Sequence, residues 1–140
     1  MPDSPSALPS EAPTDRGGAP TVLVVDDDRD GAHALCELLE LLGFATQVAY
    51  DGDEGVAVAL RERPPFVILD LHMPRMGGVL ACTRIREQVA RSRMKLVALT
   101  GSDQAIDREA AQLAGFDHFL VKPVMVGALL HLLRPTIPSA

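Results

Sequence analysis

The feature that most constrains the fold of this chain is a regular alternation of short apolar runs with segments of helical periodicity. The apolar runs are rich in Val, Leu, Ile and Phe, which is typical of buried strands. They lie at 21–26, 44–50, 66–70, 95–100 and 118–121. A chain in which strands alternate with helices favours an α/β fold, with a parallel sheet between two layers of helices.

Apolar side chains recur at helical spacing after each of these strands. Helices are expected at 32–42, 51–63, 79–92, 103–114 and 129–133. Gly43 and Gly115 are typical helix terminators, and Asp51 with Glu54 forms a capping box. Because the strands are parallel, their carboxyl ends meet at one edge of the sheet, where open α/β sheets bind ligands.

Composition separates the first 20 residues from the rest of the chain. They are rich in Pro, Ser, Ala and Gly and contain no aromatic residue. Such a segment buries too little apolar surface to offset the entropy of ordering it. We therefore expect a disordered leader or linker over 1–20, a folded domain over 21–134 and a tail over 135–140.

The overall charge and hydropathy exclude several kinds of protein. A net charge of −6 argues against direct binding to nucleic acid or to a membrane surface, both of which need a basic face. The chain has no apolar run of about eighteen residues and no signal-peptide pattern, so a cytoplasmic location is expected. Cys36 and Cys82 fall in predicted helices and are expected to be buried thiols.

Polar side chains of complementary chemistry stand at the predicted strand ends. Asp26 and Asp27 close the first strand, Asp70 the third, Thr100 the fourth, and Lys122 follows the fifth. Carboxylates this close together disfavour one another's charge unless a cation lies among them. Carboxylate oxygens are the ligands that Mg²⁺ or Mn²⁺ prefers. A carboxylate can also attack phosphorus and become an acyl phosphate, with an ammonium group and a hydroxyl stabilising the phosphoryl oxygens.

Each of these residues taken singly also has an ordinary structural explanation. Aspartates after a strand often cap helices or form turns, and this is the role expected for Asp28 and Asp30. Five residues of complementary chemistry at four strand ends nevertheless favour a phosphoryl-transfer site over five unrelated features.

The sequence resembles the receiver domains of two-component response regulators. The resemblance is carried by VLVVDDD, VILDLHMPRMGG, VALTG and FLVKPV, and it extends from residue 21 to about residue 134. It implies a flavodoxin-like fold with five parallel strands in the order 2-1-3-4-5. It also implies a cis peptide bond between Lys122 and Pro123.

The resemblance assigns a role to each candidate site residue. Asp70 would be the phosphoryl acceptor, with Mg²⁺ (or Mn²⁺) held by Asp26, Asp27, Asp70 and the backbone carbonyl of His72. Thr100 and Lys122 would contact the phosphoryl group.

The resemblance also implies a switch, formed by Thr100 and Phe119. Many members of the family carry Tyr at the second position, so a switch built on Phe119 must work by packing alone. His72 and Ser102 occupy the two positions that tune the lifetime of the phosphoryl group in the family.

The partners expected from the resemblance are proteins. The phosphoryl group would come from a sensor histidine kinase or a histidine phosphotransfer domain, and the phosphorylated domain would bind a downstream protein or a second copy of itself. Such a domain is not an enzyme in the usual sense, because it catalyses only its own phosphorylation and dephosphorylation. A free-standing regulator and the receiver of a hybrid sensor kinase both fit the sequence.

Two other functional classes are alternatives. A metal-dependent phosphatase with an aspartate nucleophile carries a second Asp two residues later, where this chain has His72 after Asp70, and it encloses its substrate with a cap insertion that is absent here. A degenerate receiver would bind partners without accepting phosphate, but all five site residues are present in this sequence.

Overall fold

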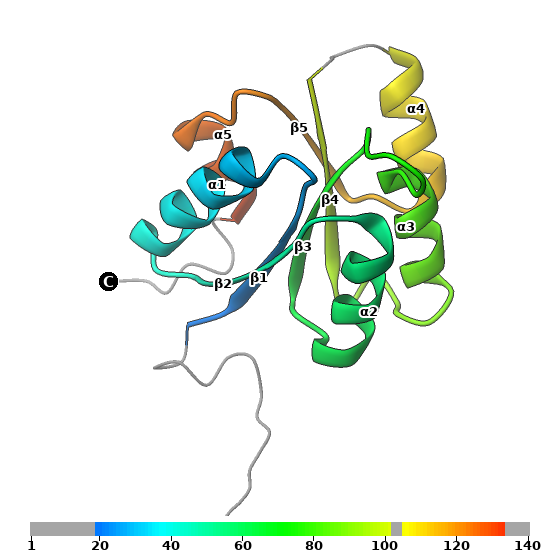
Figure 1. Ribbon diagram of the computed structural model, residues 1–140, viewed down its shortest axis with the longest axis horizontal. Coiled ribbons are helices and arrows are strands. Elements are labelled where there is room, and N and C mark those ends of the chain that lie inside the picture. The colour runs from blue at the N-terminus through cyan, green and yellow to red at the C-terminus, as the bar shows by residue number, and fades with distance from the viewer. Residues whose placement is uncertain (1–18, 102–104, 134–140) are drawn as a thin grey trace, which may run out of the picture.

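The computed structural model describes residues 19–101 and 105–133, which form an α/β sandwich (Figure 1). The strands are β1 (Thr21–Val25), β2 (Ala45–Ala49), β3 (Phe66–Asp70), β4 (Lys95–Thr100) and β5 (His118–Val121). The helices are α1 (Arg29–Leu41), α2 (Gly52–Glu62), α3 (Gly78–Arg86), α4 (Ala105–Ala114) and α5 (Val126–Leu133). Most of the predicted leader, the predicted tail and Ser102 lie outside the described residues.

The five strands form one parallel sheet in the order β2-β1-β3-β4-β5, as predicted. Every residue of β1 and β3 is buried, because both strands lie inside the sheet and are covered on both faces. This burial explains why their sequences are continuous apolar runs with no polar alternation.

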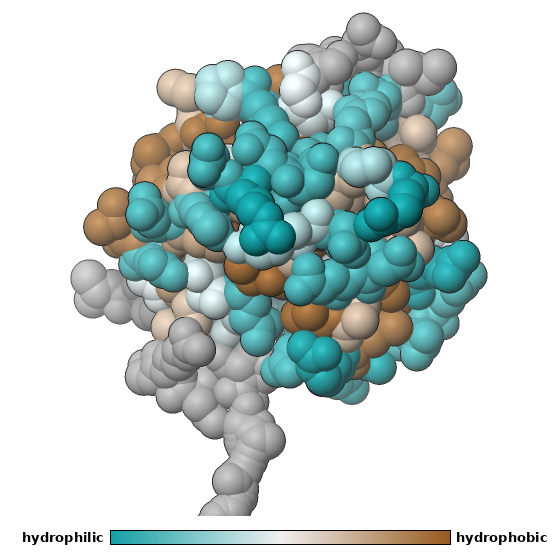
Figure 2. Space-filling model, viewed as in Figure 1, coloured by the Kyte–Doolittle hydropathy of each residue, from teal (hydrophilic) through white to brown (hydrophobic). Residues whose placement is uncertain are grey.

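The helices cover the two faces of the sheet unequally. In Figure 1, α1 and α5 lie on one face, and α2, α3 and α4 lie on the other. Alternate residues of β1 supply the two cores: Val22 and Val24 pack under α1 and α5, and Leu23 and Val25 pack under the other three helices. In the same view, Figure 2 shows hydrophilic side chains across the middle of the surface and hydrophobic patches at its sides.

Several helix ends follow the local sequence signals. Gly43 comes just after α1 in the left-handed region, with φ of +100°. The Asp51 carboxylate accepts a hydrogen bond of 2.7 Å from the Glu54 amide and so caps α2. The Tyr50 amide donates a hydrogen bond to the Glu54 carboxylate, and this donor lies one residue earlier than in the predicted capping box. Asp28 is the N-cap of α1 by position, but its side chain makes no capping bond.

The third helix is shorter than predicted, since α3 ends at Arg86 and not near Ser92. The chain beyond it tightens into turns, beginning with the bond from the Gln88 amide to the Ile85 carbonyl. Val89 continues the buried face of α3, four residues after Ile85, and its amide still donates to the Ile85 carbonyl. The turns that follow bring Met94, 2% exposed, into the core before β4 begins. Packing of Met94 therefore goes with an end of α3 earlier than the helical sequence pattern indicates.

Three other expectations concern single positions. The Lys122-Pro123 peptide bond is cis, as predicted. Cys36 and Cys82 are both buried, as predicted, and both are free thiols. Within the part of the chain that the structure describes, no helix combines the length and the apolar character needed to cross a membrane.

Candidate functional site

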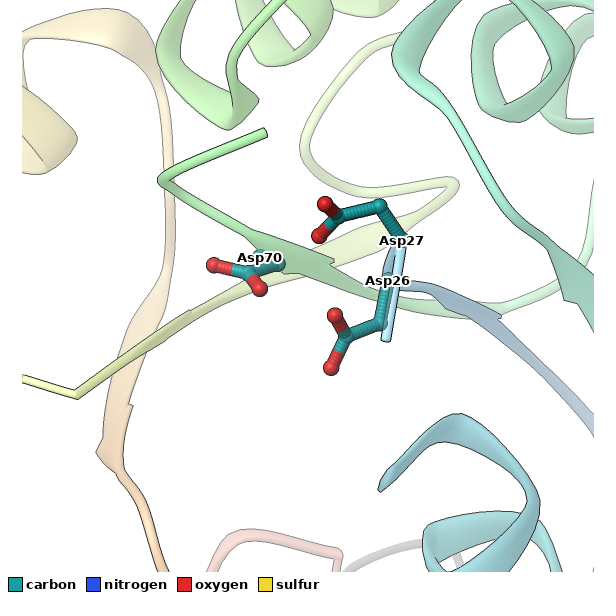
Figure 3. Close-up of side chains that lie close together, drawn as sticks. All are labelled: Asp26, Asp27 and Asp70. Atoms are coloured by element: carbon teal, nitrogen blue, oxygen red, sulfur yellow. The ribbon is translucent and has the colours of Figure 1, made fainter. Parts of the chain in front are cut away.

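Three carboxylates meet at the carboxyl ends of the two central strands (Figure 3). Asp26 and Asp27 follow β1, and Asp70 ends β3. The parallel pairing of Val25 with Leu69 brings these two strand ends level with each other. Each of the three residues offers an oxygen, and these oxygens all lie within 4.8 Å of one another. Asp26 and Asp70 are only 1% and 5% exposed, whereas Asp27 faces solvent.

Lys122 joins the two buried carboxylates. Its Nζ lies 3.0 Å from Oδ2 of Asp70 and 3.2 Å from Oδ2 of Asp26. The amide of Lys122 donates to the Thr100 carbonyl at 2.7 Å, which continues the β4–β5 ladder and directs the lysine toward the site. The side chain of Lys122 is 34% exposed, whereas the side chains of the two carboxylates it joins are almost fully buried.

Backbone amides bind the second oxygen of each buried carboxylate. The Asp28 amide donates to Oδ1 of Asp26, and the His72 amide donates to Oδ1 of Asp70, each at 3.0 Å. In both cases the donor lies two residues after the carboxylate, in an Asx-type turn. The turns orient the carboxylates without consuming all of their lone pairs, because an ionised carboxylate has about four acceptor sites.

The charges at this site do not balance. Burial raises the pKa of Asp26; the Asp28 amide opposes this shift and neighbouring Asp70 adds to it. For Lys122, burial acts to lower the pKa, but the hydrogen bonds and charges of Asp70 and Asp26 outweigh it, so the pKa is raised. Lys122 therefore stays charged, and one ammonium group faces three carboxylates.

This donor set fits a hard divalent cation. The three carboxylates supply only oxygen, and their spacing lets them face a common ion. Mg²⁺ typically binds one or two protein carboxylates and keeps several waters. The excess of negative charge at the site is what such an ion would neutralise.

Thr100 and Phe119 occupy neighbouring strands. Thr100 ends β4 and is fully buried, one residue beyond Leu99, the pairing partner of Asp70. Phe119 lies on β5, partly buried against the core beneath α4. The guanidinium group of Arg108 lies over the Phe119 ring, 4.4 Å from its centroid. The structure thus places Thr100 beside the acceptor strand and Phe119 one strand further from it.

Sequence reasoning missed two residues near the site, Asp107 on α4 and Gly78 at the start of α3. The imidazole Nε2 of His72 lies 3.5 Å from Oδ2 of Asp107 on α4. A contact between two separate segments leaves no periodic signal that could reveal it. Gly78 lies so close to the Asp70 carbonyl that a β-carbon there would overlap its oxygen. The paired glycines in the sequence were a signal for this close approach.

The family model of the response regulator receiver domain matches residues 22–134. The chain belongs to the response regulator receiver family. Receiver domains are signalling domains of two-component systems, bind Mg²⁺ at an acidic pocket and interact with histidine kinases and downstream targets.

The receiver family membership is supported by curated relatives. Response regulator MprA of Mycolicibacterium vanbaalenii is 36% identical over 122 residues, covering 84% of this chain and 52% of the relative. Response regulator MprA of Mycobacterium avium is 34% identical over 122 residues, covering 84% of this chain and 53% of the relative. The chain thus spans about half the length of the curated relatives it matches.

Solved receiver structures have the same fold. The chemotaxis protein CheY4 of Vibrio cholerae is 27% identical with a TM-score of 0.77, covering 84% of this chain and 98% of CheY4. The receiver domain of sensor histidine kinase PA1611 from Pseudomonas aeruginosa is 29% identical with a TM-score of 0.77, covering 86% of this chain and 99% of that domain. That second structure has a magnesium ion coordinated in its active-site cleft.

Proposed function

We propose that this receiver domain accepts a phosphoryl group on Asp70 from a phosphohistidine. The observation that carries the proposal is the contact of Lys122 with Asp70 and Asp26, because it joins a buried nucleophile, a second carboxylate and a cation at one point. The metal ligands in this proposal are Asp26, Asp27, Asp70 and the backbone carbonyl of His72. The magnesium ion in the active-site cleft of the similar PA1611 domain supports a magnesium site here.

Each residue of the site has a separate role in phosphoryl transfer. One carboxylate oxygen of Asp70 attacks the phosphorus, the P–N bond to the donor histidine breaks, and its electron pair stays on the imidazole nitrogen. The His72 amide, which binds Oδ1 of Asp70, leaves Oδ2 facing Lys122 and oriented for attack. The ammonium group of Lys122 then leaves the carboxylates and contacts one phosphoryl oxygen. The Thr100 hydroxyl donates a hydrogen bond to another phosphoryl oxygen. A bound Mg²⁺ supplies further neutralisation of the phosphoryl oxygens.

The phosphorylated state is reversible and is read by other proteins. Water attacks the phosphorus, the P–O bond to Asp70 breaks, and inorganic phosphate leaves. While the phosphoryl group is present, the bond from Thr100 draws that hydroxyl inward and shifts the packing of Phe119. The donor is a sensor histidine kinase or a histidine phosphotransfer domain in the cytoplasm, and the altered surface binds a downstream protein or a second copy of the domain.

Incubation with acetyl phosphate tests the proposal directly. The wild-type protein with Mg²⁺ should gain about 80 Da in intact mass, the mass of one phosphoryl group. Asp70→Asn and removal of Mg²⁺ with a chelator should each prevent the gain. Asp53→Asn, a matched change at an exposed aspartate on α2, should leave it intact. An unchanged gain in Asp70→Asn would contradict the proposal.

A further inference from the structure

We propose that Asp107 is a positioning residue that holds the His72 imidazole against α4, and that a phosphoryl group on Asp70 displaces Asp107 as the partner of His72. The inference rests on the proposed acceptor role of Asp70. It adds a physical link from the acceptor to α4 that does not run through Thr100.

The link begins with the way His72 is held. Its backbone amide donates to Oδ1 of Asp70, and its imidazole Nε2 lies 3.5 Å from Oδ2 of Asp107. The residue is therefore attached by its main chain to the acceptor and by its side chain to α4. The His72 side chain is 62% exposed and that of Asp107 is 22% exposed, so the imidazole has room to turn.

Phosphorylation would bring a stronger competitor for the imidazole. Asp107 offers a single negative charge, whereas a phosphoryl group carries up to about −2 and three acceptor oxygens. The existing contact is easily exchanged, because it is a single 3.5 Å approach between two side chains that both reach solvent. His72 lies two residues from Asp70, so the new partner appears beside the residue that must change contacts.

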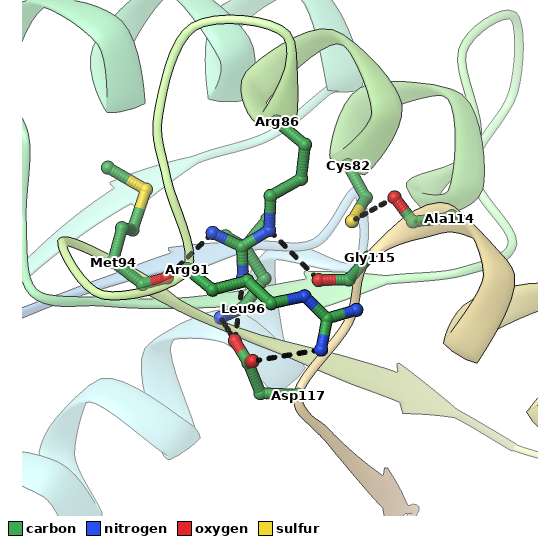
Figure 4. A network of polar contacts seen from close by, with 8 residues as sticks. All are labelled: Cys82, Arg86, Arg91, Met94, Leu96, Ala114, Gly115 and Asp117. Carbon is green, nitrogen blue, oxygen red and sulfur yellow. Dashed lines mark hydrogen bonds and ion pairs between the residues drawn. The ribbon is translucent and has the colours of Figure 1, made fainter.

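The other end of α4 is fixed by buried contacts (Figure 4). Arg86 donates to the Gly115 carbonyl at 2.9 Å and to Oδ2 of Asp117 at 2.6 Å, directly beyond the last residue of the helix. The Cys82 thiol lies 3.5 Å from the carbonyl of Ala114, the last residue of α4. Both side chains of the Arg86–Asp117 pair are only 11% exposed.

Among the described residues, the His72–Asp107 contact joins the amino half of α4 to the site, and the buried Arg86 network holds its carboxyl end. Loss of the His72–Asp107 contact loosens the amino end, while the Arg86 network holds the carboxyl end in place. Arg108, the residue after Asp107, covers the Phe119 ring. A change at the amino end of α4 is thus transmitted to the proposed switch residue through the neighbouring arginine.

Binding of beryllofluoride, a phosphoryl analogue, tests the exchange of partners in the presence of Mg²⁺. If His72 must leave Asp107, Asp107→Asn should bind the analogue about two- to fivefold more tightly than wild type. Glu109→Gln removes the same charge from an exposed position on α4 and should have no such effect. In a His72→Ala background, Asp107→Asn should cause no change. Equal affinities for wild type and Asp107→Asn, or an effect that persists without His72, would overturn the inference.

Amide hydrogen exchange in the absence of any phosphoryl analogue tests the resting contact separately. Asp107→Asn and His72→Ala should each raise exchange in the amino-terminal half of α4, and the double variant should raise it no further. The control variant Glu109→Gln should leave hydrogen exchange in α4 unchanged. If the wild type failed to bind beryllofluoride, the acceptor role of Asp70 and the displacement of Asp107 would both be overturned. The pattern of amide hydrogen exchange decides separately whether Asp107 holds His72. Additive effects of the two substitutions on hydrogen exchange would show that Asp107 does not hold His72.

Discussion

The ammonium group of Lys122 lies 3.0 Å from Oδ2 of Asp70, although 52 positions separate the two residues in the sequence. The same ammonium group reaches Asp26 at 3.2 Å. In the resting domain it stabilises two buried carboxylates that burial would otherwise disfavour. It is also close enough to the acceptor to meet a phosphoryl oxygen without a large movement of the chain.

Replacing Lys122 with Met should destabilise the domain by about 1–3 kcal/mol, because two buried carboxylates lose their counter-charge. Addition of Mg²⁺ should recover more stability in this variant than in wild type, since the ion supplies the missing charge. Urea unfolding with and without Mg²⁺ measures both effects. Lys95→Met, at the exposed start of β4, is the matched control. Equal losses in the two variants would contradict a special role for Lys122.

Asp27→Ala should weaken the stabilisation of the domain by Mg²⁺ while changing its metal-free stability by no more than about 0.5 kcal/mol. The reason is that Asp27 is exposed, so its carboxylate contributes little to the fold but offers an oxygen to the cluster. Thermal unfolding over a Mg²⁺ titration measures the effect, with Asp53→Asn as control. A midpoint that rises with Mg²⁺ in Asp27→Ala as it does in wild type would remove Asp27 from the metal site.

Arg86→Met should destabilise the domain by about 3 kcal/mol or more, because it leaves the Asp117 carboxylate buried without its closest cation. Arg84→Met, at an exposed position of the same helix, should change stability by less than about 0.5 kcal/mol. The double variant Arg86→Met/Asp117→Asn should lose less than the sum of the single losses. Urea unfolding of wild type, Arg86→Met, Asp117→Asn and the double variant measures the coupling, and strict additivity would argue against the ion pair.

Cys82 should make the domain less stable as the pH rises above 9. Burial raises the pKa of its thiol to about 12 from an ordinary value of 9.0. Between these values the unfolded chain loses the thiol proton and the folded one keeps it, so the free energy of unfolding falls by up to about 1.4 kcal/mol per pH unit. Unfolding of wild type and Cys82→Ala between pH 9 and 11 measures the difference. Parallel curves for the two proteins would contradict the raised pKa.

The sheet and the site could be predicted because their signals are local. Each strand is a short apolar run, and Asp26, Asp70 and Lys122 are fixed to strand ends that a parallel sheet necessarily brings to one edge. Gly43 marks a helix end through its backbone freedom at positive φ, and Asp51 marks a helix start through its side-chain cap.

The features that could not be predicted depend on distant contacts. The early end of α3 goes with turns that bring Met94 into the core, a burial that the helical pattern does not describe. Asp107 meets His72, and Arg86 meets Asp117 across 31 positions of sequence, only because the fold brings their segments together. Neither pair follows a helical or strand period, so neither could be found without the structure.

Reductive trapping of the phosphorylated residue tests the central claim most directly. Borohydride converts an aspartyl phosphate to homoserine, and peptide mass spectrometry then locates the converted position. After incubation with acetyl phosphate and Mg²⁺, the account predicts homoserine at position 70 and nowhere else. Homoserine at position 26 or 27, or none at any position, would contradict it.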